Sequence, residues 1–276
     1  MKISLLPLAC LVVPLLANAG PSVQPEMLAA VEARRDGRYD EALSIVKKRF
    51  ERMASGARDA RQDYFITLFE WEHLAAEHAT ARMALISERD EQVRRLLEGD
   101  VIFYADEFLP ITRLHVVIDI NQSLQDGRAT YRLMTQLLDS NQAFARWEIH
   151  RAMPAIVEAG DYALAVQHIK NPLKRLDDLN RLASELPLYP PPNTAPRLGA
   201  ELGIFMGDVV LLSKSLKGLG KDAEAEQLRT AALNGLQSDE LRALASRELA
   251  EPGGIIRALA EHQMRQAMGP ASAAAP

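Results

Sequence analysis

Two histidines and a glutamate lie close together between His73 and His78, and these residue types can bind zinc. The inverted zinc-protease motif places two residues between the first histidine and the glutamate, whereas three separate His73 from Glu77. The two histidines are five positions apart, which is about 140° around an α-helix, so their rings do not converge on one ion. The segment predicts no metal site, and we expect no bound metal.

Two further patterns resemble catalytic motifs without completing them. Ser44 and Lys47 have the Ser-x-x-Lys spacing of penicillin-recognising enzymes, but the companion segments of those enzymes are absent from the chain. Gly220 and Lys221 follow one another as in a phosphate-binding loop, but Asp222 stands where Ser or Thr must bind magnesium. We therefore expect no catalytic residue and no cofactor from these patterns.

Three acidic residues, Glu70, Glu72 and Asp90, suggest a different chemistry. Glycoside hydrolysis uses two carboxyl groups, which lie about 5 to 9.5 Å apart. Acidic residues are also common on the exposed surface of helices. An enzyme of the cell envelope that hydrolyses a glycan thus remains an alternative to a protein without catalytic activity.

The first nineteen residues have the pattern of an export signal. Lys2 supplies a positive charge, residues 3–16 form an apolar run, and Ala17-Asn18-Ala19 has the small residues of a cleavage site. The run is shorter than the roughly 20 apolar residues that span a bilayer. We expect cleavage after Ala19 and a protein that works in the periplasm or is secreted.

The only cysteine, Cys10, lies inside this predicted signal. Cleavage would leave a chain without thiols, which excludes a disulfide, a cysteine-ligated zinc site and a cysteine nucleophile. The segment before Cys10 is too short for a lipoprotein signal, so no lipid anchor is expected.

Charge and hydropathy exclude two classes of partner. The formal net charge of −5 becomes −6 when Lys2 is removed, and acidic and basic residues are interspersed without a basic block. This argues against a nucleic-acid partner. Beyond the predicted signal, no segment is apolar enough to cross a membrane.

The remaining chain is predicted to be all-α, because Ala, Leu, Glu and Arg dominate it and apolar residues recur at helical spacing. The pattern predicts helices over residues 26–36, 39–54, 59–78, 80–98, 111–126, 128–139, 141–158, 161–169, 172–185, 197–217, 221–235, 238–250 and 254–267. The β-branched run at 115–120 also fits a strand, but a strand needs a partner, so a helix is favoured. Pro154 is expected to kink its helix.

One segment interrupts the helices with several prolines. Residues 187–196 predict an extended connector between a helical array over 20–186 and further hairpins, packed on the same array, over 197–268. Residues 269–276 are expected to form a disordered tail.

Three predicted turns between helices share a glycine followed five residues later by an alanine, and two of them have a tyrosine between. Glycine can adopt the left-handed conformation that ends a helix, and a small alanine allows two antiparallel helices to touch. The residues are Gly37, Tyr39, Ala42, Gly160, Tyr162, Ala165, Gly220 and Ala225.

This pattern resembles the tetratricopeptide repeat, a family of stacked helix hairpins. The resemblance covers the hairpins around 26–54, 143–170 and 205–234, and the glycines are not spaced by the family's 34 residues. It implies a TPR-like α-solenoid or an irregular array of stacked antiparallel hairpins. It also implies a concave surface, lined by the first helix of each hairpin, that binds a peptide or protein.

Two sets of residues are candidates for contact with a partner. Arg146, Trp147, His150 and Arg151 combine the residue types that are favoured at binding hot spots. Three glycines at every fourth position predict close approach of another backbone, either within the chain or in a homodimer; they are Gly199, Gly203 and Gly207.

The sequence therefore predicts a scaffold or adaptor of the cell envelope that binds a protein or peptide and catalyses no reaction. The envelope enzyme with paired carboxylates and a structural homo-oligomer are the alternatives.

Overall fold

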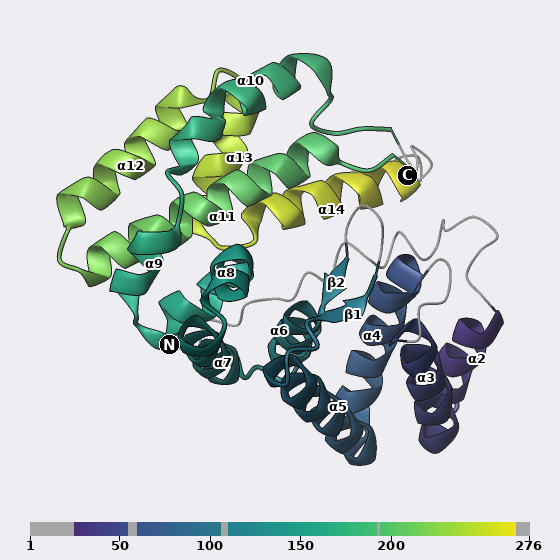
Figure 1. The fold of residues 1–276 in the computed structure, drawn as a ribbon. Coiled ribbons are helices and arrows are strands. Elements are labelled where there is room, and N and C mark those ends of the chain that lie inside the picture. Colours follow the sequence, from purple (N-terminus) through teal and green to yellow (C-terminus); the bar gives the residue numbers. More distant parts are fainter. Residues whose placement is uncertain (1–24, 55–59, 106–109, 192–193, 269–276) are drawn as a thin grey trace, which may run out of the picture. The chain divides into compact units, whose positions relative to one another are not determined.

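The computed structural model describes residues 25–54, 60–105, 110–191 and 194–268 (Figure 1). The predicted export signal and the predicted C-terminal tail lie outside these ranges. The described residues are almost entirely helical, which confirms the predicted all-α class. None of their helices has both the length and the apolar character needed to span a bilayer.

The chain divides into two compact units between Ala159 and Gly160. The predicted boundary lay elsewhere, at the Pro-rich segment 187–196. That segment does not separate the units, because Leu188 is 5% exposed and Tyr189 packs against the same hydrophobic core as the helices that follow.

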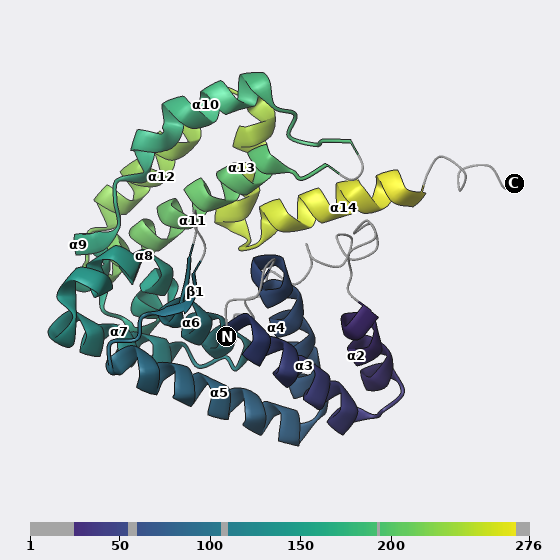
Figure 2. The same cartoon turned by 45° about the vertical axis from the view of Figure 1, so that its right-hand side comes forward.

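The C-terminal unit is built around one long helix. Helix α11 is contacted by α9, α10, α12, α13 and α14, and its buried side chains form the centre of the core (Figure 2). The predicted helix over 172–185 is divided into a short 3₁₀ helix and α10. The elements are α9 (Tyr162–His168), η2 (Pro172–Arg175), α10 (Leu176–Glu185), α11 (Arg197–Gly218), α12 (Asp222–Gly235), α13 (Asp239–Ala250) and α14 (Gly254–Met268).

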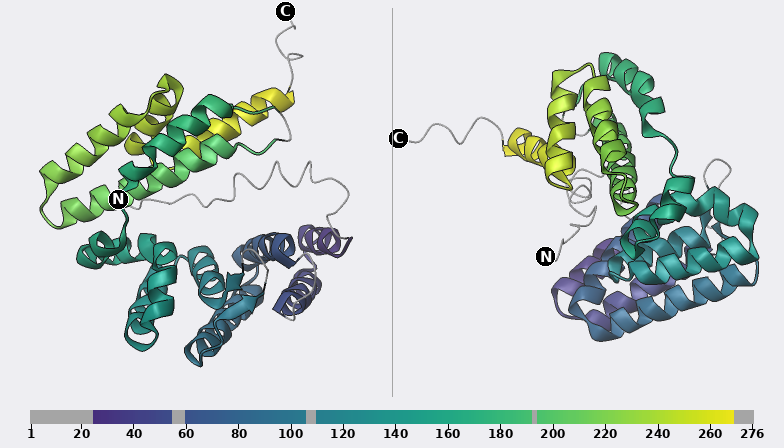
Figure 3. Two further views of the ribbon diagram at one scale, coloured as in Figure 1. Left: turned by 45° about the horizontal axis from the view of Figure 1, so that its top comes forward. Right: turned by 90° about the vertical axis from the view of Figure 1, so that its left-hand side faces the viewer.

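The N-terminal unit is a row of helices in which each packs against the next. Contacts between second neighbours, α2 with α4, α3 with α5 and α6 with α8, arrange the helices in two layers (Figure 3). Even-numbered helices form one layer and odd-numbered helices the other. They are α2 (Pro25–Arg35), α3 (Tyr39–Ala54), α4 (Ala60–Glu77), α5 (Ala79–Leu97), α6 (Arg113–Ser123), α7 (Gly127–Ser140) and α8 (Gln142–Ala159).

A small antiparallel ribbon precedes α6 and was not predicted. Strand β1 (Ile102–Tyr104) pairs with β2 (Ile111–Thr112), so the predicted helix over 111–126 begins two residues later, at Arg113. The Thr112 side chain caps α6 by accepting a hydrogen bond from the backbone N–H of His115 at 3.1 Å. The β-branched run at 115–120 lies inside α6, as predicted.

The three predicted glycine turns each lie between two helices. Gly37, Gly160 and Gly220 have φ angles of 75°, 84° and 74°. These angles favour glycine, because a side chain in this region meets the backbone. The alanines five residues later, Ala42, Ala165 and Ala225, are fully buried. The division between the units falls at Gly160, so the predicted hairpin over 143–170 does not lie within one unit.

Aromatic side chains from three elements fill the core of the N-terminal unit. The ring of Phe50 in α3 lies 5.6 Å from that of Trp71 in α4 and 5.0 Å from that of Phe103 in β1. Trp71 donates a hydrogen bond from Nε1 to the carbonyl of Ala81 at 3.1 Å, which joins α4 to α5. The burial of these rings fixes the positions of α3, α4 and the ribbon.

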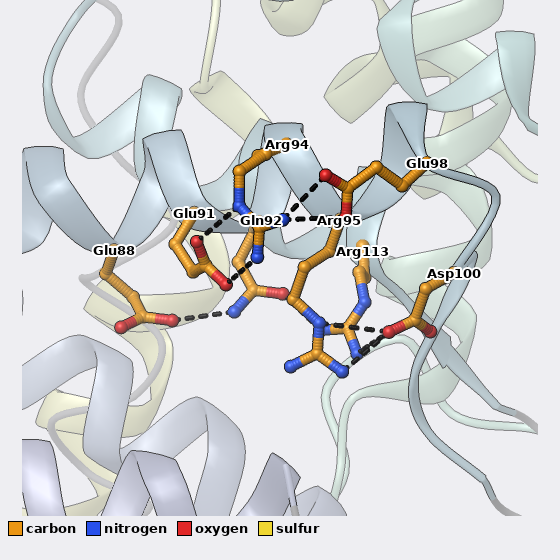
Figure 4. A network of polar contacts seen from close by, with 8 residues as sticks. All are labelled: Glu88, Glu91, Gln92, Arg94, Arg95, Glu98, Asp100 and Arg113. Carbon is orange, nitrogen blue, oxygen red and sulfur yellow. Dashed lines mark hydrogen bonds and ion pairs between the residues drawn. The ribbon is translucent and has the colours of Figure 1, made fainter.

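A buried arginine holds the start of α6. The Arg113 side chain is 2% exposed and donates hydrogen bonds to Gln92 Oε1 in α5 and to Asp100 Oδ2, the latter at 2.7 Å (Figure 4). Arg95 binds the same carboxylate at 2.6 Å, and the Arg113 guanidinium lies over the ring of Phe103. We call Gln92, Arg95, Asp100 and Arg113 the Arg113 clamp. It ties α5, the ribbon and α6 together.

Candidate binding face

Helices α4, α6 and α8 of one layer present half-buried and exposed side chains on a common face. The residues recur every three or four positions on each helix, so each set lies along one side of its helix. We define the α4–α6–α8 face as Phe65, Phe69, Glu72, His73, His115, Asp119, Ser123, Phe144, Trp147 and Arg151.

Two polar contacts join α4 to α6 across this face. Tyr64, buried beneath Phe65, donates a hydrogen bond from its hydroxyl to Asp119 Oδ2 at 2.7 Å. Ser123 hydrogen-bonds to Glu72 Oε1, and its hydroxyl also lies 2.9 Å from the backbone carbonyl of Asp119. The carboxyl groups of Glu72 and Asp119 are thereby held on neighbouring helices.

His115 lies one helical turn before Asp119 and is part of the same arrangement. Its Nε2 is 3.3 Å from Asp119 Oδ2, and its ring centroid is 6.3 Å from that of Phe65. An imidazole at this distance from a carboxylate forms an ion pair only when it is protonated. The face therefore places the imidazole of His115 beside the carboxyl of Asp119.

Helix α8 joins the face through a buried ion pair. Glu148 is 1% exposed; its Oε1 accepts a hydrogen bond from Thr112 at 3.3 Å, and its Oε2 lies 2.7 Å from Arg151 Nε. The Arg151 charge also reaches Asp119, where it lowers the carboxyl pKa, although it is not the main influence there. The positive charge of Arg151 is therefore balanced mainly by Glu148, and its effect on Asp119 is smaller.

Burial raises the pKa of both face carboxyls. It brings the pKa of Asp119 to about 7; the Tyr64 hydrogen bond opposes this rise and the nearby Glu72 charge adds to it. Burial also raises the pKa of Glu72, against the effect of the Ser123 hydrogen bond. In the described part of the chain, no lysine or arginine forms an ion pair with either group. A pKa near 7 leaves Asp119 partly protonated at neutral pH.

The most exposed side chains of the face are aromatic. Trp147 is 58% exposed and Phe65 is 46% exposed, on α8 and α4 respectively. Phe144 lies one turn from Trp147, with ring centroids 6.2 Å apart. Large rings that remain in solvent beside partly buried carboxyls are typical of a surface that meets a ligand.

The structure places two of the four predicted partner residues of α8 on the candidate face and two outside it. Trp147 and Arg151 belong to the α4–α6–α8 face. Arg146 and His150 are exposed, and His150 Nδ1 lies 3.0 Å from the backbone carbonyl of Trp147. The sequence analysis missed the contribution of α6. Its signal is the spacing of His115, Asp119 and Ser123, which places three polar residues along one side of the helix.

The predicted group of Glu70, Glu72 and Asp90 does not form. Glu70 is 4% exposed and its carboxylate binds Arg34 of α2 at 2.6 Å. Asp90 lies on α5, where it binds the neighbouring Arg89. Residues two positions apart point to different sides of a helix, so only Glu72 reaches the face, where its neighbour is Asp119.

The other residues that resembled parts of known motifs make contacts within the fold. His73 Nδ1 lies 2.8 Å from the backbone carbonyl of Phe69, and the ring of His78 stacks on that of Tyr39 at 5.1 Å. A search of the described residues finds no group of metal-binding side chains. Gly218 contacts the Tyr162 ring, which a Cβ there would approach to 2.2 Å.

The three glycines of α11 differ in their surroundings. A Cβ added at Gly199 would lie 2.6 Å from Leu259 Cδ1, so close packing of α14 explains this glycine. Added at Gly203 or Gly207, a Cβ would meet nothing within 4 Å. Packing within the chain therefore accounts for Gly199 alone, and a homodimer seam at the other two stays a prediction.

Two shallow hollows found among the described residues lie away from the face. One is lined by α12 and α13, and the other by the α3 segment that contains Ser44 and Lys47. Neither includes a residue of the α4–α6–α8 face. The chain was compared with family models, with curated proteins and with solved structures, and it matches none of them.

Proposed function

We propose that this protein is an exported scaffold or adaptor that binds a segment of a protein partner through the α4–α6–α8 face and catalyses no reaction. The observation that carries the proposal is the exposure of Trp147 and Phe65 on one face of a helical array. The layered packing of neighbouring helices supports it, because adjacent helices then offer one extended surface.

Tryptophan and other rings contribute strongly to binding when a partner covers them. Truncation of such a hot-spot residue costs about 2 to 4 kcal/mol of binding free energy. Phe144 packs beside Trp147, and the ion pair between Arg151 and Glu148 lies one turn further along α8. The helix therefore holds Trp147 in place before a partner arrives, which reduces the entropy lost on binding.

Photo-crosslinking in the native host tests this proposal. A photoreactive phenylalanine analogue replaces Trp147 in one variant, Phe65 in a second and Met83 in a third. Met83 is the matched control, because it is 61% exposed but lies on α5 in the other layer. We expect the first two variants to give an adduct with the same partner, and the third to give none.

An adduct of equal yield at Met83, or different adducts at Trp147 and Phe65, would contradict a common binding face. The proposed export is tested in the same cells. Amino-terminal sequencing of the protein from the envelope or medium is expected to begin at Gly20, whereas a protein that keeps Met1 would refute the signal.

A hydrolase is the second candidate, and one observation favours it. The pKa of Asp119 is raised to about 7, which suits a general acid at neutral pH, and Glu72 is the neighbouring carboxyl. Assay of envelope glycans with the wild type and with Asp119→Asn separates the two functions. Turnover by the wild type that the substitution abolishes would replace the binding proposal.

A further inference from the structure

The α4–α6–α8 face has an excess of negative charge. Its carboxyls are those of Glu72 and Asp119, with Glu148 beneath, and Arg151 is the cation among them. Three negative charges and one positive charge leave two negative charges when all carboxyls are ionised. Because these groups are partly removed from water, the excess is screened less than charge on an open surface.

Several other charged groups on and around these helices are bound elsewhere. Each of these has an ion-pair partner that does not belong to the face, whereas Arg146 and Glu158 of α8 are exposed and lie outside the face. The pairs are Asp63 with Arg49, Glu70 and Glu77 with Arg34, Arg89 with Asp90 and Asp126, and Arg113 with Asp100. Tyr64 and His115 touch Asp119, and His73, on the same helix as Glu72, interacts electrostatically with Glu72.

Aromatic rings border the carboxyls from two sides. Phe65 lies beside His115, and Trp147 lies one turn before Arg151 on α8. Aromatic faces attract cations, most strongly tryptophan, and they also pack against the methylene groups of lysine and arginine. The same surface thus offers opposite charge to a cationic group and apolar contact to its stem.

We infer that the partner segment is basic, and that it places a lysine or arginine side chain over Glu72 and Asp119 with apolar residues against Phe65 and Trp147. This inference rests on the proposed function and names the chemistry of its partner. An acidic segment is the competing occupant, since Arg146 and His150 are exposed on α8. Those two groups are in open solvent, where their attraction is weak.

Binding of a cation at this position must displace protons. The pKa of Asp119 is about 7, so part of the protein carries a proton there at neutral pH. A cation favours the ionised carboxyl and lowers its pKa. By linkage, the partner binds more tightly as the pH rises, with up to about a tenfold gain per pH unit below the pKa.

Calorimetry with two matched peptides tests the inference on the full mature chain. One peptide repeats leucine, lysine and phenylalanine, and the other has glutamate in place of each lysine. Titrations at pH 6 and pH 8, in two buffers of different ionisation enthalpy, give affinities and the number of protons released. We expect the lysine peptide to bind up to about tenfold more tightly at pH 8 than at pH 6, and to release protons at pH 6.5.

Three variants, whose fold is checked by circular dichroism, locate the effect. Asp119→Asn is expected to remove most of the pH dependence and the proton release, and Trp147→Ala to weaken binding tenfold or more at both pH values. Met83→Ala, on the other layer, is the control and should change neither.

The inference is wrong if the lysine peptide does not bind at pH 8, if the glutamate peptide binds as well, or if binding releases no proton. Such a result leaves the proposed function testable by itself. A shared crosslinked partner at positions 147 and 65 would then keep the binding face and overturn only the basic chemistry of its occupant.

Discussion

Helix α6 has buried or half-buried charge at two places, and they are organised in opposite ways. At the start of α6, the guanidinium of Arg113 forms an ion pair with the carboxylate of Asp100, which has the opposite charge. About one and a half turns later, the carboxyl of Asp119 interacts electrostatically with that of Glu72 on α4, which has the same charge. Burial raises the pKa of both Asp119 and Glu72, and the Glu72 charge adds to the rise at Asp119, whereas the guanidinium of Arg113 lowers the pKa of Asp100.

The difference separates a structural cluster from a candidate binding cluster. In the Arg113 clamp, the carboxylate of Asp100 pairs with two guanidinium groups, and the contacts join three elements of the fold (Figure 4). Glu72 and Asp119 are held by the hydroxyls of Ser123 and Tyr64, which satisfy hydrogen bonds but do not neutralise charge. Perturbed carboxyls of this kind gather at functional sites.

Removal of the clamp is expected to have the largest effect. Arg113→Met leaves the carboxylate of Asp100 with Arg95 alone and removes the donor to the Oε1 atom of the buried Gln92. Asp100 is 43% exposed, so the cost comes from the hydrogen bonds that the buried guanidinium makes. A hydrogen bond to a charged group contributes about 1.5 to 3 kcal/mol, so the loss of two should lower the free energy of unfolding in urea by about 3 to 5 kcal/mol.

Arg94→Met is the control for this substitution. Arg94 lies on the exposed side of α5 and binds Glu91 and Glu98 in solvent, so its loss should leave the unfolding midpoint unchanged. Equal losses in the two variants would mean that burial of the arginine is unimportant, and the comparison between the two clusters would fail.

The second largest expected effect is a pH dependence of stability that comes from Asp119 and not from the Arg113 clamp. The pKa of Asp119 is about 7 in the folded protein and near its ordinary 3.8 when unfolded. A raised folded pKa stabilises the protein below pH 4, and this contribution is lost as the pH rises from about 4 to about 7. The loss is of the order of 2 to 4 kcal/mol after allowance for partial exposure.

Asp119→Asn should therefore match the wild type at pH 4 and exceed its stability at pH 8. Urea unfolding at pH 4, 6 and 8 measures the difference, with Asp178→Asn as an exposed carboxyl control. The same difference at every pH would show that Asp119 does not titrate in this range. Greater stability of a variant would agree with a residue that is retained for binding.

The sequence predicted most helices of both units, because their apolar residues recur on one side. It could not predict the ribbon of β1 and β2, since three residues at Ile102–Tyr104 give no periodic signal and their pairing depends on the tertiary fold. It placed a boundary at the Pro-rich segment because prolines interrupt helices, but Leu188 and Tyr189 are retained by the core.

The candidate face was predictable in part. Trp147 and Arg151 stand out by residue type, and the polar side of α6 was available in its spacing. The meeting of Glu72 with Ser123 joins residues 51 positions apart, and that of Tyr64 with Asp119 joins residues 55 apart. Such contacts depend on which helices pack together, and a single sequence does not contain that information.

The smallest expected effect tests whether like charge contributes to the raised pKa. Burial is the largest cause of the rise at Asp119, and the Glu72 charge is a lesser one. Glu72→Gln keeps a hydrogen-bond acceptor for Ser123 and removes the charge, so the pKa of Asp119 should fall but stay above its ordinary value. Carbon-13 NMR of the labelled side-chain carboxyl measures this, with Glu77→Gln as a control, because Glu77 binds Arg34 on another side of α4. A pKa that does not move would assign the rise to burial alone. The carboxyls of Asp100 and Asp119 would then differ in their exclusion from solvent and not in the charge of the groups beside them. The attraction of a basic partner to this part of the face would be weaker, because Glu72 would not add to the negative charge at Asp119.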